Sequence, residues 1–201
     1  MTRIIAGFAG SITITVPGRG TRPTSDRVRE AIFSSLESRG GFAGARVVDL
    51  YAGSGALGLE AVSRGAESAA LVEKNGAAAM ACRRNAATVL RSAPRRAAGD
   101  TPTVDVRAAA VQSYLASPTA PAGAPWHIAF LDPPYDLSDD DLAKDLALLV
   151  PLLTAGAIVM VERSSRSTEP AWPDGLTLDR RSNYGDTTLW WASTAEVDDD
   201  E

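Results

Sequence analysis

The sequence of 201 residues contains one cysteine, one histidine and no long apolar run. A single cysteine cannot form an internal disulfide bond, and one cysteine with one histidine cannot complete a structural zinc site. No stretch approaches the roughly 18 apolar residues of a transmembrane helix, and residues 1–7 lack the apolar core of a signal peptide. We therefore expect a cytoplasmic protein with no metal site and no membrane association.

The charge is unevenly distributed along the chain. Residues 1–100 contain 14 Lys plus Arg against 8 Asp plus Glu, whereas residues 101–201 contain 6 against 17. Five of the last six residues are acidic, so we expect residues 196–201 to form a solvated tail. A basic front half favours an electropositive face for nucleic acid, with solvated arginine-rich helix surfaces as the alternative.

A β-branched run predicts an N-terminal strand over residues 12–16, and a separate helical pattern begins after Ser25. From residue 46 onward, strand patterns alternate with helix patterns. The alternation predicts a mostly parallel sheet with helices on both faces and a closing antiparallel hairpin. The later predicted strands are 47–51, 69–73, 104–107, 128–131 and 157–162, and the hairpin strands are 176–181 and 187–192. A short predicted helix ends near residue 64, and the later predicted helices span about 75–91, 110–116 and 138–153.

A glycine pattern follows the strand at residues 47–51. Gly53, Gly55 and Gly58 are spaced as G-x-G-x-x-G at the start of a helix, where glycine allows a tight turn and close approach of a ligand. Glu73 ends the next strand, 20 residues after Gly53, and its carboxylate can accept hydrogen bonds from ribose hydroxyls. The pattern predicts a nucleoside cofactor, either a dinucleotide or S-adenosylmethionine.

Asp49 distinguishes between these two cofactors. It lies within the strand, four residues before Gly53. The pyrophosphate of a nicotinamide dinucleotide would repel a nearby carboxylate, whereas S-adenosylmethionine carries a sulfonium and an ammonium. Asp49 therefore favours S-adenosyl-L-methionine over a nicotinamide cofactor.

The tetrapeptide Asp132-Pro133-Pro134-Tyr135 follows the predicted strand at residues 128–131. Two prolines fix the backbone and remove two amide donors. The Asp132 carboxylate and the Pro133 carbonyl can each accept one hydrogen of a planar exocyclic amine, and Tyr135 can stack on the base. This turn predicts methyl transfer to an amine of a nucleobase, in which positioning supplies most of the rate.

Three blocks together resemble a known family. They are residues 22–33 (RPTSDRVREAIF), residues 49–61 (DLYAGSGALGLEA) and residues 130–135 (FLDPPY). In order and spacing, the chain is similar to the bacterial methyltransferases that modify the exocyclic N2 of one guanine in 16S ribosomal RNA. The resemblance covers residues 3–192 and implies the Rossmann-like class I methyltransferase fold, an α/β fold with a seven-stranded sheet.

The resemblance also implies roles for individual residues. Asp132, Pro133, Pro134 and Tyr135 would be catalytic, and the opening block would contribute Arg22, Asp26 and Arg29 to RNA binding. The expected cofactor-binding residues are Thr24, Asp49, Tyr51, Ala52, Gly53, Ser54, Gly55, Gly58, Glu73, Lys74, Ala110 and Val111. We expect an N-terminal β extension at residues 1–22, a methyltransferase domain at residues 23–195 and the acidic tail at residues 196–201.

The chain differs from the family pattern at its N-terminus. The family has a basic run in its first strands, whereas residues 8–13 of this chain carry no charge. Fewer phosphate contacts predict weak binding of naked RNA. The resemblance implies 16S rRNA as the substrate, and we expect the protein to act on it within an assembled or assembling small ribosomal subunit, whose protein and RNA would supply binding surface that this chain lacks. We also expect a monomer.

Other functions share parts of this pattern. A DNA adenine-N6 or cytosine-N4 methyltransferase would use the same turn at residues 132–135, although sequence-specific DNA enzymes carry a separate recognition domain. A nicotinamide-dependent oxidoreductase would use the glycine loop, and a non-catalytic binding module would not need the turn.

Overall fold

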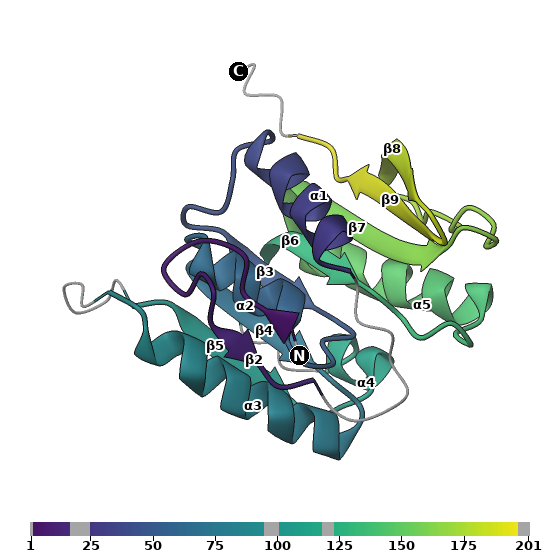
Figure 1. The fold of residues 1–201 in the computed structure, drawn as a ribbon. Helices are drawn as coiled ribbons and strands as arrows, with labels where there is room; N and C mark the ends of the chain where they lie inside the picture. The colour runs from purple at the N-terminus through teal and green to yellow at the C-terminus, as the bar shows by residue number, and fades with distance from the viewer. Residues whose placement is uncertain (1, 17–24, 95–100, 118–122, 197–201) are drawn as a thin grey trace.

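The elements follow the alternation that the sequence predicts (Figure 1). A computed structural model of the chain describes residues 2–16, 25–94, 101–117 and 123–196. In chain order, the elements are β1 (Thr2–Arg3), β2 (Thr13–Ile14), α1 (Asp26–Glu37), β3 (Arg46–Asp49), α2 (Ala56–Ser63), β4 (Ser68–Val72), α3 (Gly76–Arg91), β5 (Thr103–Arg107), α4 (Val111–Leu115), β6 (Trp126–Leu131), α5 (Asp139–Leu149), the 3-10 turn η1 (Val150–Leu152), β7 (Leu153–Ser164), β8 (Thr177–Tyr184) and β9 (Thr187–Ser193).

Seven strands form one sheet in the order β5-β4-β3-β6-β7-β9-β8. The first five strands in this order pair in parallel, and β9 is antiparallel to both β7 and β8. The strand order reverses between β3 and β6, and ligands of open α/β sheets bind outside the carboxyl ends of the strands at such a point. The topology therefore places a candidate site next to the ends of β3 and β6.

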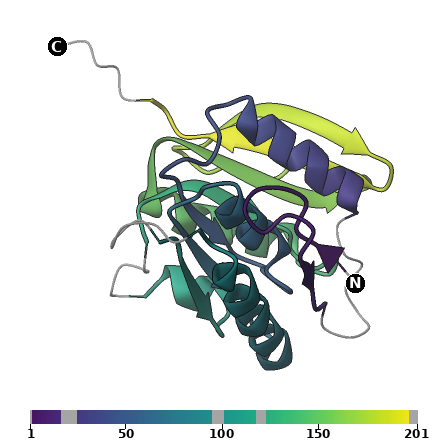
Figure 2. The same cartoon turned by 60° about the vertical axis from the view of Figure 1, so that its left-hand side comes forward.

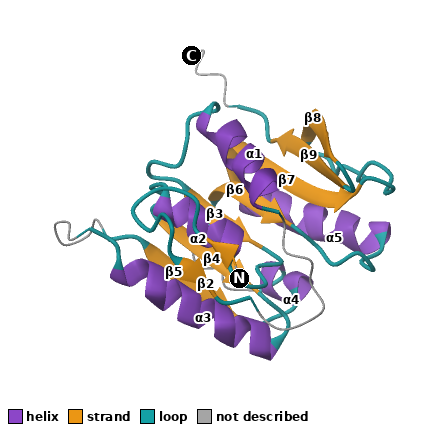
Figure 3. Cartoon of the chain, in the orientation of Figure 1, coloured by secondary structure: helices purple, strands orange, loops and turns teal. Residues whose placement is uncertain are grey.

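Side chains of the central strands alternate between two cores. Val47 and Phe130 pack in one core with residues of α1, α2 and α3, whereas Val48 and Leu131 pack in the other with residues of α4 and α5. Successive side chains of a strand point to opposite faces, so helices cover both faces of the sheet (Figure 3). Helix α1 lies along the C-terminal strands (Figure 2), where Arg180 donates a hydrogen bond to Ser35.

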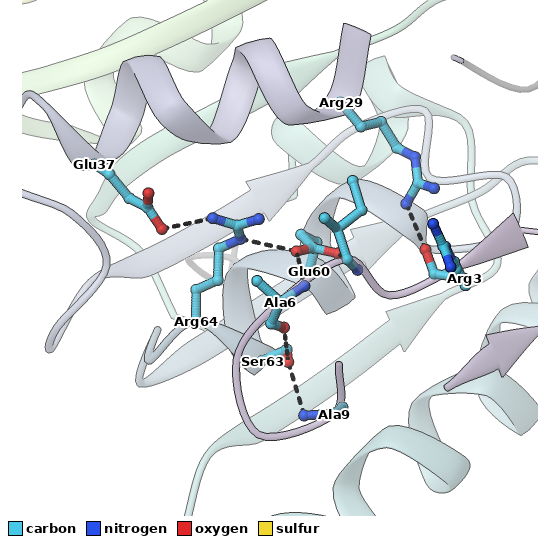
Figure 4. Close-up of polar contacts among 9 residues, drawn as sticks. Arg3, Ala6, Ala9, Arg29, Glu37, Glu60, Ser63 and Arg64 are labelled. Atoms are coloured by element: carbon cyan, nitrogen blue, oxygen red, sulfur yellow. Dashed lines mark hydrogen bonds and ion pairs between the residues drawn. The ribbon is translucent and has the colours of Figure 1, made fainter. Parts of the chain in front are cut away.

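The N-terminal segment is held by side chains rather than by a long strand ladder. The predicted strand at residues 12–16 is wrong in extent, because β1 and β2 pair over only two residues each. The buried carboxylate of Glu60 accepts the N–H groups of Ile5 at 2.6 Å and Ala6 at 2.9 Å, and it also accepts from Arg64 Nε (Figure 4). Glu60 thus provides the acceptors that a neighbouring strand would otherwise supply.

Hydrophobic packing joins the same segment to the main core. Ile4, Ala9 and Ile14 are buried among residues of α1, α2 and α3. Ser63 accepts a hydrogen bond from the Ala9 N–H at 2.9 Å and donates one to the Ala6 carbonyl. The domain boundaries near residues 22 and 195 stay predictions.

Several further elements differ from their predicted extents, and β8 continues to Tyr184, beyond the predicted end at residue 181. The predicted helix over residues 138–153 ends at Leu149 and continues as η1. Strand β7 is longer than the predicted 157–162, because its residues pair with β6 on one side and with β9 on the other. Within the described ranges, no helix has the length and apolarity needed to cross a membrane.

Replacing Glu60 with alanine should lower the free energy of unfolding by roughly 2–4 kcal/mol, because two backbone donors and the Arg64 guanidinium lose a buried acceptor. Equilibrium urea denaturation measures this change. Glu37→Ala is the matched control, since Glu37 binds the same Arg64 at the surface and its side chain is 52% exposed. The control should cost less than about 1 kcal/mol, and equal losses in both variants would contradict the role of Glu60.

Candidate active site

A cavity of about 1180 Å³ opens at the carboxyl ends of β3, β4, β6 and β7. Most of the residues predicted for the site line it: Arg29, Asp49, Tyr51, Ala52, Gly53, Ser54, Glu73, Lys74, Ala110, Val111, Asp132, Pro133, Pro134 and Tyr135. Asp26, Gly55 and Gly58 are not among the lining residues, and Arg22 and Thr24 lie outside the described residues. The structure thus brings the predicted cofactor loop and the predicted catalytic turn into one cavity, while their individual roles stay predictions.

Glycine is required at the three positions of the loop for different structural reasons. Gly53 and Gly55 have φ of +53° and +82°, a conformation that favours glycine. Gly58 lies in α2, where an added Cβ would come within 2.2 Å of Leu71 Cδ2. Gly58 therefore permits close packing of α2 on the sheet instead of contact with a ligand.

Asp49 is 1% exposed and lies beneath the loop. Its Oδ2 accepts the Gly58 N–H at 3.1 Å, while Oδ1 is buried without a hydrogen-bond partner among the described residues. Burial, together with the smaller effect of the nearby charges of Asp132 and Glu73, raises the pKa of Asp49 to about 7. A cationic group in the cavity would favour the ionised form of this carboxylate.

Glu73 is held at the end of β4 by two backbone donors. Gly53 N–H donates to its Oε2 at 2.9 Å, and Asn75 N–H donates to its Oε1 at 2.6 Å. Each carboxylate oxygen can accept a further hydrogen bond. The carboxylate is therefore fixed beside the glycine loop, where acceptors for ribose hydroxyls are predicted.

The turn after β6 also lines the cavity. Asp132 is partly buried, and the Pro134 carbonyl accepts the Leu137 N–H at 3.0 Å, which closes the turn. The side chain of Tyr135 is one of two large apolar side chains that are exposed in the described part of the chain, with 69% of its surface accessible. An exposed aromatic ring at the margin of a cavity is suited to stacking on a planar base.

The residues predicted to bind RNA do not form one exposed group. Arg29 is 1% exposed, and its guanidinium donates to Asp26 Oδ1 at 2.6 Å. It also donates to the Arg3 carbonyl at 2.9 Å (Figure 4). Arg29 therefore ties α1 to β1. Direct contact of Arg29 or Asp26 with RNA stays a prediction.

Sequence reasoning missed several polar residues that line the cavity. The Tyr51 hydroxyl donates a hydrogen bond to the carboxylate of Asp145 on α5, whose pKa burial raises. Gln112 and Asp141 also line the cavity, as does Glu162 at the end of β7. The rule that singled out Glu73, a carboxylate at the end of a buried strand, would also have found Glu162.

The single histidine and the single cysteine lie outside the lining of the cavity. His127 Nδ1 accepts the Arg46 N–H at 3.1 Å, and Cys82 is buried in α3. Among the described residues, no group of three or more His, Cys, Asp or Glu side chains is arranged to hold a metal ion.

The raised pKa of Asp49 predicts how stability depends on pH. Between pH 4 and 7 the folded protein retains a proton that the unfolded chain has released, so the free energy of unfolding should fall as pH rises through about 7. The decline should be on the order of 1–4 kcal/mol, since one pKa unit corresponds to about 1.4 kcal/mol. Urea denaturation at pH 5 and pH 8 measures it. Asp49→Asn should lose most of this decline, and an equal decline in both proteins would contradict the assignment.

Known proteins resemble the chain over nearly its full length. Ribosomal RNA small subunit methyltransferase D of Escherichia coli strain K12 is 34% identical over 184 residues, which are 91% of this chain and 85% of that protein. The solved yhhF protein of Escherichia coli is 33% identical, with a TM-score of 0.73 and coverage of 97% and 98%. A solved hypothetical protein of Thermus thermophilus is 30% identical, with a TM-score of 0.75 and coverage of 98% and 100%.

These similarities confirm the predicted Rossmann-like class I methyltransferase fold. The family model described as conserved hypothetical protein 95 matches residues 2–193, a range that contains both the glycine loop and the turn after β6. The resemblance predicted from the motifs is thereby confirmed. The chain belongs to the conserved hypothetical protein 95 family, the family of ribosomal RNA small subunit methyltransferase D.

Proposed function

We propose that the protein transfers a methyl group from S-adenosyl-L-methionine to the exocyclic N2 of a guanine in 16S rRNA, of the guanine-966 type. The observation that carries the proposal is the shared cavity, in which the glycine loop and the Asp132–Tyr135 turn face one space. Family membership supports ribosomal RNA as the substrate, because the 34% identical relative is named for the small subunit. The protein acts as a monomer on an assembled or assembling subunit.

The cavity fits this cofactor. Asp49 is a buried carboxylate in the lining, and a cationic end of the cofactor would favour its ionised form. Glu73 would hold the ribose hydroxyls, and the loop at residues 51–54 would lie against the cofactor. Ala110 and Val111 would contact adenine through backbone groups and packing. When bound, S-adenosylmethionine supplies a methyl group that its sulfonium activates.

The turn after β6 positions the acceptor amine. The Asp132 carboxylate and the Pro133 carbonyl each accept one N2 hydrogen, which aims the nitrogen lone pair at the methyl carbon. With the cofactor bound, its methyl group would be transferred from sulfur to N2, and Asp132 would accept the proton that the nitrogen then releases. Positioning supplies most of the rate, because the methyl group is already activated.

The proposal is tested with small ribosomal subunits that lack the modification. The wild-type protein should transfer one methyl group per subunit, and mass spectrometry should place it on N2 of one guanine. Asp132→Ala should abolish transfer while calorimetry shows unchanged cofactor affinity. Asp174→Ala is the control, because Asp174 is exposed and does not line the cavity. Cofactor binding without transfer by the wild-type protein would overturn the substrate assignment.

A second prediction concerns the exposed ring of Tyr135. Tyr135→Ala should reduce kcat/KM for the subunit by roughly 5- to 150-fold, the equivalent of about 1–3 kcal/mol of lost stacking. Tyr135→Phe keeps the ring and should stay within about threefold of wild type. Met80→Ala removes the other large exposed apolar side chain, which lies on α3 away from the cavity, and should have no effect. Full activity of Tyr135→Ala in this assay would refute stacking.

A further inference from the structure

Four neighbouring strands of the sheet each bring one carboxylate to the cavity. Glu73 follows β4, Asp49 ends β3, Asp132 follows β6 and Glu162 lies near the end of β7. The proposed function uses the first three carboxylates. Glu162 is 8% exposed, and nothing in the proposed chemistry yet accounts for a buried carboxylate at this point of the lining.

Strand register places Glu162 beside Asp132. Phe130 pairs with Met160, and Leu131 pairs with Val161 across β6 and β7. The next positions along these two strands are Asp132 and Glu162. Neighbouring strands are about 4.8 Å apart, so the two residues leave the sheet one strand spacing from each other.

The alternation of side chains places both carboxylates on one face. Phe130 and Met160 belong to the core under α1, α2 and α3, whereas Leu131 and Val161 belong to the other core. Glu162 lies within β7, two residues beyond Met160, so its side chain is on the side of α1, α2 and α3. Continuing the alternation one residue past the end of β6 puts Asp132 on the same side. A base whose amine is held by Asp132 therefore lies next to the strand that carries Glu162.

The chemistry of that edge differs among nucleobases. In guanine, the N2 amine adjoins the N1–H donor. In adenine, the N6 amine adjoins N1, which is an acceptor, and in cytosine the N4 amine adjoins N3, also an acceptor. An ionised carboxylate only accepts hydrogen bonds, so it pairs with the guanine edge and faces a lone pair in the other two bases.

We propose that Glu162 selects guanine: its carboxylate accepts the N1–H of the target base while Asp132 and Pro133 hold the N2 amine. The inference rests on the proposed function and deepens it, because the turn at residues 132–135 alone suits any planar exocyclic amine. A carboxylate has two oxygens with about four acceptor sites, so Glu162 can receive the base in addition to protein partners.

The test compares guanine with 2-aminopurine at the methylated position of reconstituted small subunits. 2-Aminopurine keeps the amine but has an acceptor at N1. The wild-type protein should prefer guanine by about 100-fold or more in kcat/KM, because a site built to accept a hydrogen bond strongly rejects an analogue without the donor. Glu162→Gln should reduce this preference to less than about tenfold, since its amide can donate to the N1 acceptor.

Glu162→Asp is the conservative variant. It keeps an acceptor-only group, so it should retain the preference for guanine even if its rate falls. Calorimetry with S-adenosylmethionine and the urea midpoint show whether each variant keeps its fold. Glu169→Gln, an exposed carboxylate outside the cavity, should behave as wild type.

The possible results separate the two proposals. Undiminished guanine preference in folded Glu162→Gln would overturn the role of Glu162 and leave the proposed function standing. Absence of transfer by the wild-type protein to guanine subunits would overturn the proposed function, and the selection of guanine with it. Loss of preference in both Glu162→Gln and Glu162→Asp would also contradict the inference, because it would assign Glu162 a packing role.

Discussion

The hydrogen bond from the Gly58 N–H to the buried Asp49 carboxylate fixes the geometry of the whole cavity. It joins the first turn of α2 to the end of β3, and it forms only because Gly58 has no Cβ to meet Leu71. The glycine loop is thereby held between Asp49 and Glu73, at the point where strand order reverses. The contact thereby holds one wall of the cavity in place.

The same contact leaves a carboxylate in an unfavourable environment. Burial and the charges of Asp132 and Glu73 act against ionisation of Asp49. An isolated buried carboxylate is costly unless it is paired or protonated. The site therefore has a preference for positive charge before any ligand binds, and this preference separates a sulfonium cofactor from one that carries a pyrophosphate.

Local sequence patterns were sufficient to predict the sheet, and together with the family resemblance they predicted half of the residues that line the cavity. Buried runs and glycine spacing depend on neighbours in the chain, so the strand preceding Gly53 and the turn after residue 131 could be identified directly. The N-terminal pair could not, because β1 and β2 are short where Glu60 and Asn85 replace strand partners with side chains. These contacts span 55 and 70 residues, and no local pattern encodes them.

The position of Glu162 shows why site residues are harder to predict than the sheet. Its importance arises from register, since pairing of Leu131 with Val161 sets it beside Asp132, and register appears only when β6 and β7 are adjacent. The turn at residues 132–135 recognises an amine, which guanine, adenine and cytosine all possess. Discrimination among them must therefore come from a group one atom further along the base edge, and the neighbouring parallel strand is the element that can deliver a side chain there.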